Sequence, residues 1–235
     1  MKIDKIYIVH YTKLIHRKEE ILRILESIDI PYEFISEFDR DELTDDILKK
    51  YYDPDPIKYA NKAMLWGHAN EFRTLNGAEI SSTIKHINAL DKISKECDSC
   101  GLILEDDIVP LFFDFLEEIN NSINESDNWD VIYLGKGMGD DFIKTKTKTK
   151  ISENLYLINH PASNCGESYC VRKEVAKKIV DSVIPFQNVS DWEFAYSYYI
   201  NNLKIIWRLP SIFDQGSKNG IYKSSQRDNY EDSIL

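Results

Sequence analysis

The sequence predicts an α/β protein with a mixed, mostly parallel central sheet flanked by helices. Short apolar runs rich in β-branched and aromatic residues alternate along the 235 residues with stretches whose apolar residues recur at helical spacing. The first two runs enclose a helix within 40 residues, which is typical of a βαβ unit with parallel strands. We find no internal repeat and no linker. We therefore expect one domain over residues 1–235, with a polar, irregular tail after about residue 216.

The first βαβ unit is the clearest of these patterns. Residues 6–9, Ile-Tyr-Ile-Val, are typical of a buried strand. Apolar residues at 21, 22, 25 and 28 then recur at helical spacing after a charged start, and Pro31 ends this helix. Residues 32–35 predict a second strand that ends near Asp39.

The middle of the chain gives an uneven signal. Residues 40–76 show weak periodicity, and the Asp-Pro-Asp-Pro sequence at 53–56 predicts irregular structure because each proline also restricts its predecessor. A helix is predicted over about 79–96, from five isoleucine and leucine residues at helical spacing. Residues 101–104 then predict a strand that leads directly into three acidic residues.

The remaining elements follow the same alternation, and prolines or glycines separate several of them. The lysine–threonine run at 144–150 has like charges on alternate residues, so we expect a surface hairpin or loop there. Strands are predicted at 129–134, 155–158, 169–171 and 203–207, and helices at 174–183 and 190–200.

Composition excludes several classes of protein. The 29 basic and 40 acidic residues give a net charge of −11, which argues against general nucleic-acid binding through a basic surface. No apolar stretch approaches the roughly 18 residues of a membrane-spanning helix, and the N-terminus lacks the features of a signal peptide. Four cysteines are too few for a disulfide framework. We expect a cytoplasmic protein with at most peripheral membrane contact.

Three adjacent carboxylates, Glu105, Asp106 and Asp107, follow an apolar strand. Ligands of open α/β sheets bind beyond such strand ends, and Mg²⁺ or Mn²⁺ prefers oxygen ligands. In an extended segment Glu105 and Asp107 would point one way as a metal pair, and Asp106 the other way. The alternative is a solvated acidic turn. A phosphohydrolase would need a nucleophilic aspartate followed closely by threonine, and the sequence has none here.

A polar stripe is predicted along the helix at 79–96. Glu79, Ser82, Thr83 and His86 lie at spacings of 0, 3, 4 and 7 and so share one face. This face presents a carboxylate, two hydroxyls and an imidazole together. The alternative is an ordinary exposed face, with the glutamate favoured near the helix N-terminus.

An acid beside a tryptophan, Asp191-Trp192, suits carbohydrate chemistry. The indole can stack on the apolar face of a sugar while the carboxylate accepts a hydroxyl proton. The alternative is that Ser190 or Asp191 caps the following helix, and both roles are compatible.

The cysteines allow a second kind of metal site. Cys97 and Cys100 have the spacing of a metal or redox pair, and Cys165 and Cys170 would complete four thiolates for zinc. The second pair has four intervening residues and no histidine cluster accompanies it, so we expect unpaired, partly buried thiols instead.

Taken together, the motifs resemble glycosyltransferase family 25, which includes lipooligosaccharide and procollagen galactosyltransferases. The resemblance spans roughly residues 5 to 217. It implies a GT-A type fold, a nucleotide-sugar donor (typically UDP-galactose), a divalent metal and inversion at the anomeric carbon. It rests on Tyr7-Ile8-Val9-His10 with Arg17, Ile30 to Phe34, Glu79-Ile80 with His86, Leu104 to Asp107, Trp129 to Gly135, and Asp191-Trp192.

The resemblance also implies roles for individual residues. Glu105 and Asp107 would hold Mn²⁺ or Mg²⁺ on the diphosphate, and Asp191 would be the base that accepts the acceptor's proton. Three further residues would contact the donor: Asp39 near the uridine or ribose, Asp106 near the ribose or sugar, and Gln215 near the donor end. The nucleotide pocket would be lined by His10, Tyr11, Thr12 and Arg17.

The sequence departs from this family pattern in one helix. Lys85 stands where serine is common, and Ser81 stands where glycine is usual. We expect this lysine to alter the acceptor surface or to face solvent. The predicted function is a metal-dependent inverting glycosyltransferase that moves a sugar, with galactose favoured, from a UDP-sugar to a saccharide or hydroxylated protein. The alternative is a catalytically silent relative that binds a sugar nucleotide or glycan.

Overall fold

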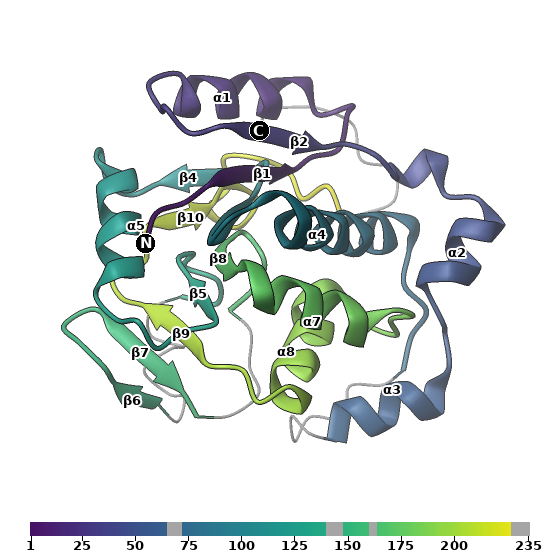
Figure 1. Ribbon diagram of the computed structural model, residues 1–235. Helices are drawn as coiled ribbons and strands as arrows, with labels where there is room; N and C mark the ends of the chain where they lie inside the picture. Colours follow the sequence, from purple (N-terminus) through teal and green to yellow (C-terminus); the bar gives the residue numbers. More distant parts are fainter. Residues whose placement is uncertain (65–71, 140–147, 160–163, 227–235) are drawn as a thin grey trace.

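A computed structural model describes residues 1–64, 72–139, 148–159 and 164–226 of the protein (Figure 1). An eight-stranded sheet, ordered β2-β1-β3-β8-β5-β9-β7-β6, forms its centre. Six of these strands run in one direction, and β7 and β8 run against them. The strands are β1 Lys5–Val9, β2 Tyr32–Ile35, β3 Cys100–Glu105, β5 Val131–Tyr133, β6 Lys148–Lys150, β7 Leu155–Ile158, β8 Ser168–Arg172 and β9 Ile205–Arg208.

Helices cover both faces of this sheet, and a small antiparallel sheet of β4 (Ile108–Pro110) and β10 (Phe213–Gln215) lies beside it. The fold class predicted from the sequence, a mixed and mostly parallel sheet flanked by helices, is confirmed. The helices are α1 Ile15–Leu25, η1 Arg40–Glu42, α2 Asp45–Tyr51, α3 Pro56–Ala63, α4 Gly77–Glu96, α5 Phe115–Asn124, α7 Lys173–Val183, α8 Ser190–Ile200 and α9 Gly216–Asn219.

Two hydrophobic cores, one on each face of the sheet, explain why the sequences of the strands are continuously apolar. Tyr7 and Val9 of β1 belong to the core under α4, α7 and α8, whereas Ile6 and Ile8 belong to the core under α1 and α5. Alternate residues of one strand point to opposite faces, and here helices bury both faces. In Figure 1, α4 and α7 lie on the same side of the sheet.

The prediction of irregular structure at residues 53–56 is confirmed for 53–55 and wrong for Pro56. Helix α3 begins within this sequence, at Pro56, and the side chain of Asp55 accepts hydrogen bonds from the N–H groups of Ile57 and Lys58. Proline is tolerated in the first turn of a helix because its missing N–H would have no intrahelical partner there. Helix α2 precedes it, with Thr44 as its N-cap, and together with η1 these helices hold more than half of the residues that the structure describes within 40–76.

The carboxyl ends of three neighbouring strands determine where the candidate site lies. Strands β2, β1 and β3 are parallel neighbours, so their carboxyl ends open at one edge of the sheet, beside the N-terminal half of α4. The lysine–threonine run enters the described residues only as β6, which pairs with β7; residues 144–147 lie outside them. No helix in the described ranges is long and apolar enough to cross a membrane.

Candidate functional site

Two adjoining hollows lie at the carboxyl edge of the sheet. Both are lined by Ser82, Glu105, Gln215 and Gln226, so they meet at the end of β3. The first hollow also contains the ends of β1 and β3 and the start of α9. The second extends towards the N-terminus of α8 and is further lined by Glu79, Thr83, Cys165, Gly166, Val189, Ser190, Asp191 and Lys218.

Helix α4 separates the two hollows. Ala78, Ser81 and Lys85 line the first hollow, whereas Glu79 and Thr83 line the second. Three residues of the predicted polar stripe, Glu79, Ser82 and Thr83, line the second hollow together, so the stripe is not an ordinary exposed face. Thr83 is buried and donates to the carbonyl of Glu79, and His86, which is fully buried, bonds to Tyr169 and Glu105.

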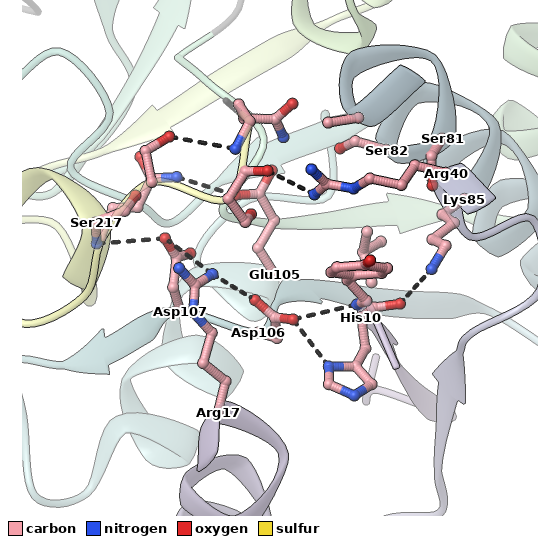
Figure 2. A pocket seen from close by; sticks show the side chains of 17 residues that line it. His10, Arg17, Arg40, Ser81, Ser82, Lys85, Glu105, Asp106, Asp107 and Ser217 are labelled. Carbon is pink, nitrogen blue, oxygen red and sulfur yellow. Dashed lines mark hydrogen bonds and ion pairs between the residues drawn. The ribbon is translucent and has the colours of Figure 1, made fainter. Parts of the chain in front are cut away.

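The acid cluster does not keep the alternation of an extended strand. Strand β3 ends at Glu105, and Asp106 and Asp107 form a turn into β4. Because the backbone turns here, all three carboxylates line the first hollow (Figure 2). The expectation that Asp106 points away from the other two is therefore wrong.

Asp106 is fully paired by the protein. Its Oδ2 lies 2.8 Å from Nδ1 of His10 and accepts the main-chain N–H of Tyr11 at 3.3 Å, and its Oδ1 accepts from Arg17 at 2.8 Å. Burial opposes ionisation of Asp106, but the hydrogen bond from His10 and the charge of Arg17 outweigh it and lower its pKa. The predicted donor-binding residues His10, Tyr11 and Arg17 thus surround this carboxylate.

Asp107 has a different environment. Its Oδ2 accepts from the N–H of Ser217 at 3.3 Å, but its buried Oδ1 has no partner within the described part of the chain. Burial and the neighbouring charge of Glu105 raise the pKa of Asp107 to about 7. A positive charge bound here would stabilise the ionised form.

The oxygens around Asp107 fit a hard divalent cation. Glu105 Oε2 accepts from Gln215 at 3.0 Å, and the other amide atom, Gln215 Oε1, is also buried without a described partner. No three His, Cys, Asp or Glu side chains among the described residues form a metal site by themselves. Mg²⁺ sites often use only one or two carboxylates and complete their shell with phosphate and water. Glu105, Asp107 and Gln215 therefore provide a donor set that suits such a cation.

Lys85 lines the first hollow, and the expectation that it faces solvent is wrong. It is only 2% exposed, and its Nζ donates to Asp39 and to the carbonyl of His10. Burial lowers its pKa, which the Asp39 partner opposes. The other carboxylate oxygen of Asp39 accepts the N–H of Thr12 at 3.2 Å, so Asp39 and Thr12 lie behind the wall of the hollow. The sequence pattern that could have indicated this position is the spacing of residues 78, 81, 82 and 85, because residues at this spacing share one helix face.

The tail after residue 216, predicted to be irregular, begins with the short helix α9 and forms one wall of the first hollow. Arg17 donates to the carbonyl of Lys223 at 2.7 Å, and Arg40 donates to the carbonyl of Ser225 at 2.5 Å. The guanidinium of Arg17 also lies over the ring of Tyr222, 5.0 Å from its centroid. Arg40 gave no sequence signal, because its role depends on a segment 185 residues further along the chain.

Asp191 lies in the second hollow, in the first turn of α8. Its Oδ1 accepts the N–H of Trp192 at 2.9 Å, whereas the N-cap of α8 is Val189 and no side chain caps this helix. The capping alternative for Ser190 and Asp191 is therefore wrong. Burial and the charge of Glu105 raise the pKa of Asp191.

Glu167 supports the loop that borders the second hollow, and sequence patterns gave no indication of it. It is fully buried, and its Oε1 accepts the N–H of Gly137 at 2.5 Å. Burial and nearby Glu105 raise the pKa of Glu167 to about 8. Lys218 completes the support, because its Nζ donates to the carbonyl of Gly137 at 3.0 Å. The backbone of Gly137 has φ of +52°, which favours glycine.

The four cysteines all lie in the described ranges, and there they do not form a group that could hold a metal ion. All four are unpaired, and Cys97, Cys100 and Cys170 are buried while Cys165 is partly exposed. The prediction of unpaired thiols is confirmed.

Comparisons with known proteins find one matching protein family. The family model "Glycosyltransferase family 25 (LPS biosynthesis protein)" matches residues 3–203. Comparison with curated proteins gives no match. Among solved structures, the A197 protein from STIV is 14% identical, with a TM-score of 0.42, and the match covers 91% of this chain and 83% of that one. A UDP-glucose pyrophosphorylase complexed with UDP-glucose is 12% identical, with a TM-score of 0.44 and 91% of each chain covered.

Proposed function

The chain belongs to glycosyltransferase family 25, and we propose that it is a metal-dependent, inverting transferase that moves galactose from UDP-galactose. The acceptor is a saccharide or a hydroxylated protein. One observation carries the proposal: Glu105 lines both hollows, so the hollow with the oxygens suited to a cation adjoins the hollow that Asp191 lines.

The first hollow suits the nucleotide diphosphate of the donor. Arg17 and Arg40 bring positive charge to its wall, and Arg17 also balances the charge of Asp106. Guanidinium groups match phosphate oxygens in shape and charge. Glu105 and Asp107, with Gln215, would hold Mn²⁺ or Mg²⁺, which supplies Lewis-acid stabilisation of the departing diphosphate.

The second hollow suits the acceptor. Asp191 lines it and is the base that removes the proton from the acceptor hydroxyl. Its raised pKa makes it a stronger base than an exposed aspartate. A base in one hollow and a leaving group in the other favour attack from the face opposite the diphosphate, which inverts the anomeric centre.

Asp106 acts as a positioning residue in this scheme. Both of its oxygens are engaged by His10, Tyr11 and Arg17, so it fixes the end of β1 and the arginine against the hollow. The sequence-based role of contacting the ribose or sugar directly is less favoured by these contacts.

The test is a panel of nucleotide sugars offered with Mn²⁺ and an oligosaccharide acceptor. We expect UDP-galactose to be consumed, a new glycosidic bond to form with inverted configuration by NMR, and chelation by EDTA to stop both. Retained configuration, or full activity after chelation, would contradict the mechanism. The alternative, a catalytically silent binding module, predicts nucleotide binding without any hydrolysis or transfer.

A further inference from the structure

Lys85 is a buried cation on the wall of the first hollow that the proposed reaction does not use. Its Nζ donates to the carboxylate of Asp39 and to the main-chain carbonyl of His10. An ammonium group has three N–H donors. These are its two acceptors among the described residues, so one N–H remains on a side chain that lines the hollow (Figure 2).

The partners of Lys85 define its place along the sheet edge. Asp39 follows β2, His10 follows β1, and Glu105 ends β3, and these strands are ordered β2-β1-β3. Neighbouring strands lie about 4.8 Å apart, so the β2 end is about 10 Å from the end of β3. The ammonium therefore lies where the chain leaves β2 and β1, whereas Asp107, with its unpartnered oxygen, follows β3.

We propose that Lys85 binds the donor directly, by donating its remaining N–H to an oxygen of the nucleoside, either a base carbonyl or a ribose oxygen. This inference rests on the proposed function, because it takes a nucleoside diphosphate as the ligand. An ammonium group only donates hydrogen bonds, so the group it contacts must be an acceptor.

The contacts of Lys85 make it suited to this role. A lysine side chain is long and flexible, but Asp39 and the His10 carbonyl fix its ammonium group in one position. Asp39 also balances the buried charge, which would otherwise be strongly destabilising. The helix face that carries Lys85 continues through Ser81 and Ala78, which line the same hollow.

The experiment must separate direct contact from neutralisation of Asp39. Lys85→Met alone leaves Asp39 buried without its cation, so the comparison is made between Asp39→Asn and the double variant Lys85→Met/Asp39→Asn. Binding of UMP, of UDP with Mn²⁺, and of pyrophosphate with Mn²⁺ is measured by calorimetry. Lys85→Leu/Asp39→Asn replaces the double variant if the latter fails to unfold cooperatively.

We expect UMP and UDP to bind about 10- to 100-fold more weakly to the double variant than to Asp39→Asn, which corresponds to one hydrogen bond from a charged donor. Pyrophosphate should bind the two variants within about twofold, since it lacks the nucleoside. Lys95→Met is the matched control on the same helix, because Lys95 is exposed and pairs with Asp91. It should bind all three ligands as the wild type does.

Two results would overturn the inference alone. Equal UMP affinity in Asp39→Asn and the double variant would limit Lys85 to pairing with Asp39. If pyrophosphate affinity falls as much as UMP affinity in the double variant relative to Asp39→Asn, Lys85 contacts the phosphates instead of the nucleoside. A wild-type protein that binds neither UMP nor UDP would instead overturn the proposed function, and this inference with it.

Discussion

Arg17 Nη1 lies 2.8 Å from Asp106 Oδ1, across 89 residues of sequence, and both side chains are buried. The same nitrogen is 3.8 Å from Asp107 Oδ2. The central carboxylate of the acid cluster is thus satisfied by the protein, and the unsatisfied oxygen belongs to Asp107. This division of roles among three adjacent acids leads to the first two predictions.

Asp107→Asn should abolish the dependence of donor binding on the metal. The variant retains the shape of the side chain but removes a charge that a divalent cation would need. We expect Mn²⁺ to strengthen UDP binding by at least tenfold in the wild type and by less than twofold in the variant, as measured by calorimetry. Asp181→Asn, an exposed aspartate paired with Lys177, is the control and should keep the Mn²⁺ effect.

Arg17→Met should destabilise the fold. It leaves Asp106 buried with only His10 and a main-chain N–H as partners, and removing one member of a buried ion pair costs about 3 kcal/mol or more. The measurement is the free energy of unfolding in urea. Adding Asp106→Asn should recover part of the loss, because the uncompensated charge is then gone. No recovery would show that Arg17 acts mainly through the segment at 222–226.

Asp191→Asn should separate binding from transfer. Asparagine cannot accept the proton, so kcat should fall about 10²- to 10⁴-fold while UDP-galactose affinity stays within about twofold. Wild-type activity should rise with pH through the raised pKa of Asp191, since the base must lose its proton to act. The acidic limb of the pH profile should be missing in the residual activity of the variant. An unchanged kcat would place the base elsewhere.

Gly101→Ala should destabilise the packing of α4 on β3. A methyl group at Gly101 would lie 2.5 Å from Cγ1 of Ile93, a buried side chain in the core of α4. Overpacking of this kind costs about 1–3 kcal/mol. Gly77→Ala is the control, because its nearest neighbour would be 3.7 Å away, and it should be neutral or stabilising by up to about 1 kcal/mol in urea unfolding.

The interpretation of residues 53–56 shows a limit of local rules. The two prolines argue against regular structure, yet Asp55 and Pro56 are the N-cap and first residue of α3. The same residues can end one element or begin another, and their position relative to the next apolar face decides which.

The sequence by itself determined the elements whose pattern is local: strands at 6–9, 32–35 and 101–104, and the helix predicted over 79–96, which the structure shows as Gly77–Glu96. It also placed three carboxylates at a strand end, because periodicity and strand ends are properties of neighbouring residues.

Only the tertiary structure decided what those charges do. It paired Asp106 with Arg17, left an oxygen of Asp107 without a partner, and turned Lys85 inward to Asp39. The physical reason is that the state of a buried charge depends on the groups packed around it, and these come from distant segments that meet only in the folded chain.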